Sequence, residues 1–525
     1  MTAFSLPTDR LSLVVGVTGH RDVADADEAP LRNAFGSVLR ELSKTCPHTP
    51  LVVLSGLAVG ADSLAAEEAI AQNIPVIACL PMPVAEYEQD FSPTELTRFR
   101  SLLAACARVT VTSPERENGY VATGLFIVHY SHVLVAFWDG TSSRGKGGTA
   151  DVLDMRMTGE TDLGPAYHIV TPRTNGPRPA DACSVNRMYP RRFRHDVTSE
   201  ADFRVILGRM DLYNTDLAQT PESASTVEAL KELMDRTDAT ANRLQERTNL
   251  FQMILFACAF LGATIQILSQ LPSFVKIVGI VAAFVAYRIA RKNDYENRYQ
   301  DYRALAEGLR VQHAWYCAGL IHDFADRAYL RMQEGELQWI RMALRSFYLT
   351  CCDDRGCPDV SPDRPIGIDW VRSQWRYYHK ASRREAGKNR LLGRTAGAAV
   401  GIGIASTVVS VVLLLPQWAH VGFWTIQPGW PREILSEALT VPLAMAAMLA
   451  ALIGHYIEKR NFTTNARRYE RMFHVFDKAL RELHAEKGKT TRAQEILLAL
   501  GRAALIEHAD WLIMRRDRPI GMVVV

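Results

Sequence analysis

Glycines and polar residues gather in short turns that follow apolar runs in the first third of the chain. One turn holds Gly19, His20 and Arg21, the next runs from Ser55 to Asp62, and a later one reads Lys146-Gly-Gly-Thr149. Glycine lets a ligand approach the backbone, while guanidinium, ammonium and hydroxyl groups bind phosphate. A single turn of this kind is weak evidence. Three of them, each at the end of a predicted strand, predict a nucleotide-type ligand.

The elements that must position these turns are strands of a parallel sheet. Six apolar runs bounded by turn residues predict strands at 11–16, 51–55, 74–79, 107–112, 132–138 and 167–170. Helix-length stretches such as 30–44 and 60–72 lie between them. This alternation predicts an α/β fold, a doubly wound, Rossmann-like parallel sheet with helices on both faces. Ligands of such sheets bind beyond the carboxyl ends of the strands, near the switch in strand order.

The predicted ligand-binding residues are those that follow the strands. They are Gly19, His20, Arg21, Ser55, Gly56, Gly60, Asp62, Pro81, Tyr87, Asp139, Gly140, Lys146, Gly147, Gly148 and Thr149. No Ser/His/Asp or HExxH arrangement can be assembled, so we predict no catalytic residue, metal ligand or cofactor.

Each of these assignments has a structural alternative. Asp62 and Asp151 can interact only with helix N-termini, and His20 can be a structural turn residue. Arg21 can pair only with Asp22 or with a neighbouring helix, and the glycines can serve tight turns without a ligand.

The same turns resemble the SLOG superfamily, Rossmann-like nucleotide-derivative sensors with a few nucleotide hydrolases. The resemblance rests on Thr18-Gly19, on the Ser-Gly-x-Ala-x-Gly-Ala-Asp run from 55 to 62, and on Gly-Gly-Thr at 147–149. It implies that Gly19, Ser55, Gly56, Gly60, Gly147, Gly148 and Thr149 line the pocket. The hydrolase branch carries Gly-Gly-x-Gly-Thr-x-x-Glu, whereas Val152 stands at the glutamate position here and Asp151 comes one residue early. That departure favours sensing over hydrolysis.

The second half of the chain contains four long apolar runs. We predict transmembrane helices at about 249–268, 273–290, 395–415 and 437–457, each close to the ~20 residues that a bilayer span requires. The alternative is a pair of helical hairpins buried in a soluble core, but these runs are longer than core helices need.

Basic residues flank the two predicted hairpins and are scarce at their tips. Arg243, Arg247, Arg291 and Lys292 flank the first, and a denser Arg/Lys cluster flanks the second. Trp418, Trp424 and Trp430 surround the second tip, as in an aromatic belt. The positive-inside rule therefore predicts a multi-pass protein of a bacterial inner (plasma) membrane, with the N-terminal domain and the C-terminus in the cytosol.

The helical half resembles the SLATT families, two-span effector modules found with SLOG proteins in bacterial defence systems. The resemblance covers about residues 225–520 and rests on the run 302–310, the Gln374-x-x-Tyr-Tyr-His379 run and Glu507-His-Ala-Asp-Trp511. It implies membrane permeabilisation triggered by a nucleotide. In the third predicted span, Gly397 and Gly401 stand four residues apart, a spacing that permits close helix packing in lipid.

These observations divide the chain into a SLOG-like nucleotide-binding domain (1–175), a linker or insertion (176–224), a first helical two-span module (225–350), a loop (351–364) and a second two-span module (365–520). The net charge of +3 gives no general case for nucleic acid. Nine cysteines in 525 residues do not indicate a disulfide framework, and the spacing of Cys351, Cys352 and Cys357 matches no standard zinc pattern. The residues from 1 to 10 lack the apolar core of a signal peptide.

Two functions from different classes remain. In the first, a cytosolic sensor binds a nucleotide second messenger, a cyclic nucleotide or an ADP-ribose derivative, and opens a pore formed by a homo-oligomer in the lipid bilayer, as an antiphage effector. A messenger-synthesising enzyme encoded nearby is an expected partner. In the second, the chain is a membrane-tethered hydrolase of a nucleotide or its N-glycosidic bond, which would need Asp151, Arg21 or Asp62 for catalysis.

Overall fold

The computed structural model describes residues 4–142, 146–158, 164–174, 176–190, 198–221, 229–267, 273–320, 323–329, 337–352, 367–418, 432–485 and 490–517. The chain forms two compact units, each described here by itself. The first contains Met1–Thr240 and Asp301–Asp359, and the second contains Ala241–Gln300 and Val360–Val525.

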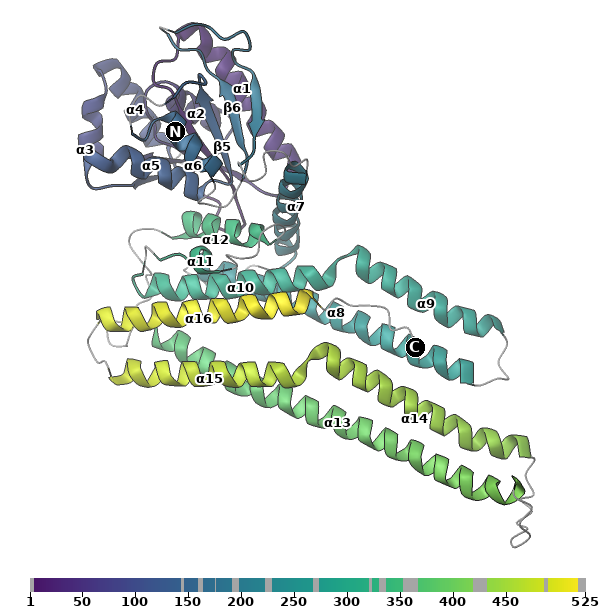
Figure 1. The fold of residues 1–525 in the computed structure, drawn as a ribbon. Helices are drawn as coiled ribbons and strands as arrows, with labels where there is room; N and C mark the ends of the chain where they lie inside the picture. Colours follow the sequence, from purple (N-terminus) through teal and green to yellow (C-terminus); the bar gives the residue numbers. More distant parts are fainter. Residues whose placement is uncertain are drawn as a thin grey trace. The chain divides into compact units, whose positions relative to one another are not determined.

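The first unit is built on a seven-stranded, mostly parallel sheet (Figure 1). Its strands are β1 (Leu13–Gly19), β2 (Leu51–Ser55), β3 (Val76–Leu80), β4 (Arg108–Val111), β5 (Val133–Trp138), β6 (Ala166–Val170) and β7 (Val185–Met188). Their order is β4-β3-β2-β1-β5-β6-β7, with only the pair β6–β7 antiparallel. The six strands predicted from apolar runs, and the parallel Rossmann-like sheet, are confirmed.

The seventh strand lies in the segment that was predicted as a linker. The sequence Val185-Asn-Arg-Met188 contains two apolar residues and is partly exposed, so it has no run typical of a buried strand. The basic cluster 191–195 in the same segment lies outside the described residues.

Helices cover both faces of the sheet. The crossover connections that contain them run in two directions along the sheet, which creates its switch point. The helices of this domain are α1 (Asp25–Thr45), α2 (Ala61–Ala71), α3 (Val84–Tyr87), the 3-10 turn η1 (Glu88–Asp90), α4 (Pro93–Ala105), α5 (Arg116–Tyr130) and α6 (Thr149–Thr158). The helices α1 and α2 pack together, as do α5 and α6. Strand order proceeds outward from β1 in one direction and from β5 in the other. The carboxyl ends of β1 and β5 therefore flank the switch point, where a ligand is expected.

A buried helix, α12 (Gln338–Cys351), completes the first unit at the amino ends of the strands. The Ser346 hydroxyl donates to the carbonyl of Ser12 at 2.8 Å, and the guanidinium of Arg108 donates to the carbonyls of Leu349 (2.5 Å) and Cys352 (2.7 Å). His132 bridges the backbone of β1 and the carbonyl of Met342. Burial is the main reason why the pKa of His132 falls to about 3, so this imidazole is neutral and serves as a hydrogen-bonding bridge.

A second set of contacts joins α12 to the end of α5 through α11 (Ala325–Ala328). Arg345 donates to Asp326 at 2.6 Å, and both side chains are almost fully buried. Arg345 also donates to the carbonyl of His129 on α5 at 3.3 Å. Burial opposes ionisation of Asp326, but the neighbouring Arg345 outweighs it and lowers the pKa of that carboxyl. This paired charge fixes the end of α5 to α12.

Long helices make up the rest of the chain. They are α7 (Thr198–Ala218), α8 (Ala229–Ile267), α9 (Ser273–Lys292), α10 (Tyr295–Cys317), α13 (Ile368–Trp418), α14 (Arg432–Arg460), α15 (Phe462–Ala485) and α16 (Thr490–Arg516). The helices α8 and α10 are each divided between the two units. In the second unit α13 packs against α14 and α15, and α15 packs against α16 through the Arg468–Glu507 ion pair at 3.0 Å.

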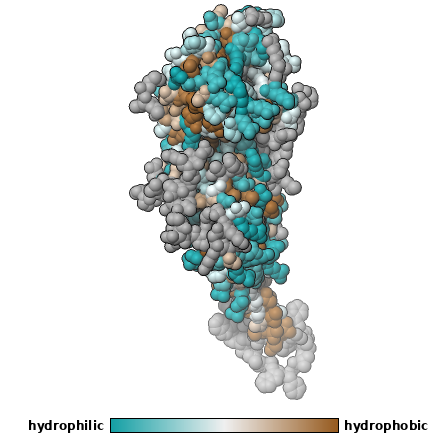
Figure 2. All heavy atoms as spheres, turned by 90° about the vertical axis from the view of Figure 1, so that its left-hand side faces the viewer, coloured by the Kyte–Doolittle hydropathy of each residue, from teal (hydrophilic) through white to brown (hydrophobic). Residues whose placement is uncertain are grey.

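Two helical segments in the described part of the chain are long and apolar enough to cross a membrane, Ile368–Val412 and Thr440–Ala485. Their most apolar windows are only 11% and 17% buried, unlike the core helix of a soluble protein. Large apolar side chains on α13, such as Ile402, Ile404 and Val412, are more than half exposed. Figure 2 shows apolar residues at the surface at the lower end of the drawing. The predicted hairpin tips, with Trp424 and Trp430, and the loop with Cys357 lie outside the described residues.

The fold requires glycine at position 60 for two reasons, its backbone conformation and the lack of space for a Cβ. A pair of substitutions can distinguish these two effects. Both Gly60 and Gly140 have positive φ angles, +87° and +84°. A Cβ on Gly60 would lie 2.4 Å from the carbonyl oxygen of Arg21, whereas a Cβ on Gly140 would meet nothing within 4 Å. We expect Gly140→Ala to cost about 1 kcal/mol through backbone strain alone, and Gly60→Ala to cost about 1–3 kcal/mol more.

The measurement is the apparent melting temperature of the full chain. Equal losses for the two variants would show that the contact between Gly60 and the loop after β1 does not constrain the fold.

Candidate functional site

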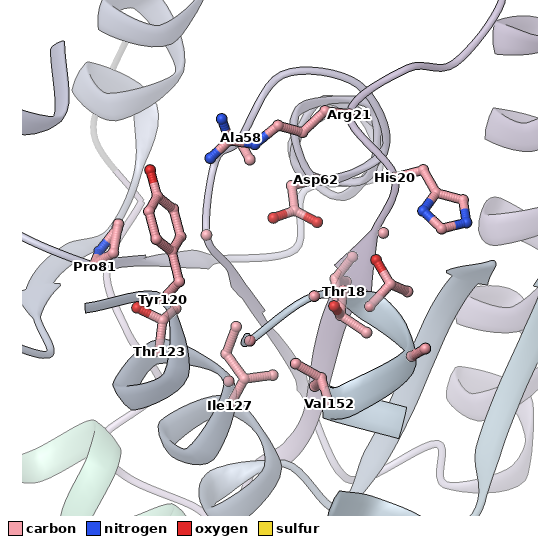
Figure 3. A pocket seen from close by; sticks show the side chains of 18 of the residues that line it. Thr18, His20, Arg21, Ala58, Asp62, Pro81, Tyr120, Thr123, Ile127 and Val152 are labelled. Carbon is pink, nitrogen blue, oxygen red and sulfur yellow. The ribbon is translucent and has the colours of Figure 1, made fainter. Parts of the chain in front are cut away.

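A cavity of about 590 Å³ opens at the carboxyl ends of the parallel strands, at the switch point (Figure 3). Its volume lies in the range typical of small-molecule sites. It is lined by Val17, Thr18, Gly19, His20, Arg21, Asp22, Gly56, Ala58, Asp62, Pro81, Tyr87, Asp90, Arg116, Tyr120, Thr123, Gly124, Ile127, Thr141, Ser142, Lys146, Gly147, Gly148, Thr149, Ala150, Val152 and Arg173.

Most of the predicted ligand-binding residues line this cavity, but four of them do not. Ser55, Gly60, Asp139 and Gly140 lie outside the lining. The Ser55 hydroxyl donates to the carbonyl of Asp62 at 3.0 Å and accepts from the N–H of Leu57 at 3.2 Å. Ser55 therefore shapes the turn between β2 and α2 in this structure.

Two loops approach each other so closely at the cavity that only glycine fits between them. A Cβ on Gly19 would lie 2.4 Å from the Cβ of Ala61 and 2.9 Å from that of Phe137. The N–H of Ala61 donates to the carbonyl of His20 at 3.0 Å. This contact brings the first turn of α2, with Asp62, beside the end of β1.

Asp62 is a buried carboxyl group directed into the cavity. The residue is 8% exposed, and Figure 3 shows its side chain among the lining residues, between Tyr120 and Thr18. Its Oδ1 has no hydrogen-bond partner in the described part of the chain. Burial raises the pKa of Asp62 to about 7, against the opposing effects of the Arg21 charge and of the Ala58 and Gly19 amides. Asp62 therefore titrates near neutral pH.

His20 is held in a charged network at the edge of the cavity. Its Nε2 lies 3.1 Å from Oδ1 of Asp139, and Nη2 of Arg173 lies 3.1 Å from its Nδ1. Arg173 also pairs with Asp139 through its Nε at 2.6 Å. Burial and the Arg173 charge lower the pKa of His20, so the ring is neutral at neutral pH. Burial opposes ionisation of Asp139, but hydrogen bonds from Thr141 and the neighbouring His20 and Arg173 side chains lower its pKa to about 2.

An aromatic and cationic wall lies on the other side. The guanidinium of Arg21 stands 5.3 Å from the centroid of the Tyr120 ring. The Tyr120 hydroxyl donates to Asp90, which also pairs with Arg116. Tyr87 is buried behind this wall and donates to the carbonyl of Gly56 at 3.2 Å. An arginine over an aromatic ring is a surface on which a flat or anionic ligand group can rest.

The turn before α6 supplies backbone amides and one exposed cation. Gly147 has a φ of +78°, and a Cβ there would lie 2.9 Å from the backbone of α5. The N–H of Gly147 donates to Oδ2 of Asp151 at 2.9 Å, so that carboxylate stabilises its own loop. Gly148 and Thr149 at the start of α6, together with Lys146, form an edge suited to phosphate.

Several lining residues were missed from the sequence. Tyr120, Thr123, Gly124 and Ile127 all come from α5, and Arg173 follows β6. The signal that could have found them is the pair Gly119 and Gly124 in α5, because a Cβ at 119 would lie 2.2 Å from the carbonyl of Pro81. Glycines at such contacts allow a helix to pack close to the strand ends.

The described residues contain no group of three His, Cys, Asp or Glu side chains that could hold a metal ion. Three of the described lining residues are aspartates: Asp90 pairs with Arg116, Asp22 lies 3.5 Å from Arg173, and Asp62 has no ion-pair partner in the described part of the chain. The carboxyl group of Asp62 interacts instead with the backbone amides of Ala58 and Gly19.

The fold defines a Rossmann-like α/β domain joined to a helical region with two candidate membrane spans. Residues 232–327 match the family described as protein of unknown function DUF4231. This match covers α8 from residue 232 onward, all of α9 and α10, and α11 as far as residue 327. No curated protein matches the chain.

The buried carboxyl of Asp62 makes a prediction about stability. Its folded pKa of about 7 exceeds the ordinary value of 3.8, so ionising it on the way from pH 4 to pH 8 costs folding free energy. Each tenfold difference in proton affinity corresponds to about 1.4 kcal/mol, which sets an upper limit of about 4 kcal/mol above pH 7. We expect Asp62→Asn to stabilise the protein, and to do so more at pH 8 than at pH 5.

Thermal unfolding of the full chain at the two pH values measures this difference, with Asp22→Asn at the cavity rim as the matched control. A variant that is less stable than the wild type at pH 8 would contradict the cost of ionising Asp62.

Proposed function

We propose that the protein is a nucleotide-gated membrane effector, in which a SLOG-like sensor controls SLATT-type helical modules. The observation that carries the proposal is a single chain that joins a switch-point cavity to long helices with exposed apolar faces. A nucleotide second messenger, a cyclic nucleotide or an ADP-ribose derivative, would be the ligand. The cellular role would be antiphage defence by permeabilisation of the plasma membrane, with a messenger-synthesising enzyme as the partner.

The chemistry of the cavity supports a nucleotide. The start of α6 offers backbone amides and the positive end of a helix dipole to phosphate, with Lys146 beside it. The Arg21–Tyr120 pair offers a flat cationic surface, and Ile127 and Val152 add an apolar floor (Figure 3). Phosphate, aromatic and apolar contacts in one cavity match the parts of a nucleotide.

A rigid helix supports communication away from the cavity. The first turns of α5 carry Arg116 and Tyr120 into the lining. Its last turn carries His129 and Tyr130, which pack against Phe324 beside α11. A ligand that binds one position of α5 better than another would shift the equilibrium of the elements fixed to its far end. A coupling of about 1–3 kcal/mol changes such an equilibrium about 5–150-fold.

The membrane part of the proposal comprises four spans and a homo-oligomer. The candidate spans in α13 and α14 are supported by their length and low burial. The first hairpin is supported by exposed apolar side chains on α9, among them Ile277, Val281 and Phe284. On α13, a Cβ added at Gly397 or Gly401 would meet nothing within 4 Å, so this face is open for close packing with another helix.

Gating can be tested by dye leakage from proteoliposomes that contain the full chain. We expect leakage only with a nucleotide that binds, because binding must favour the open state. Gly148→Asp should abolish binding and leakage, since a carboxylate at the start of α6 repels phosphate. Gly140→Asp is the control, because Gly140 lies outside the lining.

Replacing Gly397 and Gly401 with Leu should suppress leakage while leaving affinity unchanged. Leakage that is equal with and without every bound ligand would reject gating. Turnover of the ligand would then favour the membrane-tethered hydrolase.

The topology has a separate test. We expect single cysteines at positions 271 and 425, at the two predicted hairpin tips, to react with an impermeant thiol reagent on intact cells. A cysteine at 380 should react only after permeabilisation, because residues 292–392 are proposed to be cytosolic. Labelling at 380 from outside would reject the four-span topology, and the unmodified chain measures the background from the native cysteines.

A further inference from the structure

Both helical hairpins of the second unit end in a pair of cations followed by a break in the helix. The helix α9 ends with Arg-Lys at 291–292, and α14 ends with Lys-Arg at 459–460. A residue with a positive φ angle stands at each break, Asp294 (+48°) and Asn461 (+53°), and the next helix, α10 or α15, begins directly after it. Figure 1 shows the break at both places. The two hairpins therefore share a basic boundary.

The exposed surface changes from apolar to cationic at this boundary. On α9, Ile289 is 43% exposed, and the exposed Arg291 follows within one turn. On α8, the exposed Arg247 precedes Leu250 and Met253, which are 56% and 69% exposed. A helix that leaves the hydrocarbon layer of a bilayer shows this pattern, because its cations reach the head groups while its apolar side chains stay in lipid.

Side-chain contacts bring cations of the two hairpins together. The ring of Phe251 on α8 stacks on Tyr295 at the start of α10, with centroids 5.6 Å apart, and the guanidinium of Arg247 stands 5.7 Å from the centroid of the same Tyr295 ring. Arg460 at the end of α14 donates to the side-chain oxygen of Asn249 on α8. We refer to these cations and their neighbours at the helix ends as the basic belt, which consists of Arg247, Arg291, Lys292, Lys459 and Arg460.

The arginines of the belt contact neutral groups. Arg247 rests on an aromatic ring, and Arg291 donates to the Tyr287 hydroxyl at 2.8 Å. Arg460 donates to an amide and stands 5.6 Å from the centroid of the Tyr456 ring. None of the three arginines has an ion-pair partner in the described part of the chain. The helix dipoles favour cations in the last turns of α9 and α14, but Arg247 lies in the middle of α8, where this explanation does not apply.

We propose that the basic belt binds the phosphodiester head groups of anionic phospholipids. This inference rests on the proposed insertion of the helices into a bilayer and names the lipid class that they bind. Guanidinium and ammonium groups bind phosphate oxygens, and the exposed apolar faces of α8 and α9 continue from the belt as acyl chains continue from a head group. A phospholipid matches both surfaces, whereas a soluble phosphate matches the belt alone.

The test measures lipid binding to the purified full chain in detergent by native mass spectrometry. The probes are phosphatidylglycerol and phosphatidylcholine with the same acyl chains. Each Lys or Arg near an anionic head group contributes about fivefold to binding, so we expect phosphatidylglycerol to bind at least about tenfold more tightly. Arg247→Gln combined with Arg460→Gln should weaken phosphatidylglycerol about 10–30-fold and leave phosphatidylcholine unchanged. Added salt should have the same selective effect, because it screens exposed charges.

Two matched double variants separate charge from structure. Arg247→Lys with Arg460→Lys keeps both charges and should retain most of the affinity for phosphatidylglycerol. Arg376→Gln with Arg471→Gln removes two exposed cations of α13 and α15 outside the belt and should bind this lipid as the wild type does. The apparent melting temperature shows whether a variant has lost its fold. The lipid preference of the wild type and its dependence on salt test the proposal even where a variant does not fold.

Three outcomes would overturn the inference. Equal affinity for the two lipids would reject the belt as a head-group site and leave the proposed nucleotide gating intact. Displacement of phosphatidylglycerol by an equal concentration of glycerophosphoglycerol or inorganic phosphate would assign the belt to a soluble phosphate. Release of the full chain from cell membranes by alkaline carbonate would reject bilayer insertion, and with it both the lipid site and the proposed membrane effector.

Discussion

The close approach of the loop after β1 to the first turn of α2 is the constraint on which the site depends. Neither Gly19 nor Gly60 has space for a side chain, because Ala61 and the carbonyl of Arg21 occupy it. The approach buries Asp62 beside Gly56 and removes the carboxyl group from water. The raised pKa of Asp62 and the position of the cavity both follow from this contact.

The charged groups around the cavity fall into two sets, those that pair with one another and those that do not. Asp139, His20 and Arg173 satisfy one another, as do Asp90, Arg116 and the Tyr120 hydroxyl. Such paired groups maintain the shape of the walls. Asp62, Lys146, Gly148 and Thr149 also line the cavity, where a ligand can contact them. Which side chains pair with one another is not specified by residue type alone.

The sequence was informative about the sheet and about the turns that follow its strands. Residues 51–54 are apolar and buried on both faces of the sheet, a pattern typical of a covered parallel sheet. β7 could not be predicted, because Asn186 and Arg187 interrupt its pattern and its pairing is set by β6. Tyr120 and Arg173 were missed for a similar reason. Their place in the cavity depends on how α5 and the segment after β6 return to the switch point, which no local pattern records.

The two ends of α5 have an implication for protein engineering. One end contributes Tyr120 to the cavity, and the carbonyl of His129 at the other accepts a hydrogen bond from Arg345 of α12. Gly119 and Gly124 also fit this helix to Pro81 and Val152 without space for larger residues. A chimera that exchanged only the loops after β1 and β2 would receive the part of the cavity that these loops form, without the part that α5 forms. Transfer of ligand preference between related chains would require α5 and α12 to be exchanged together.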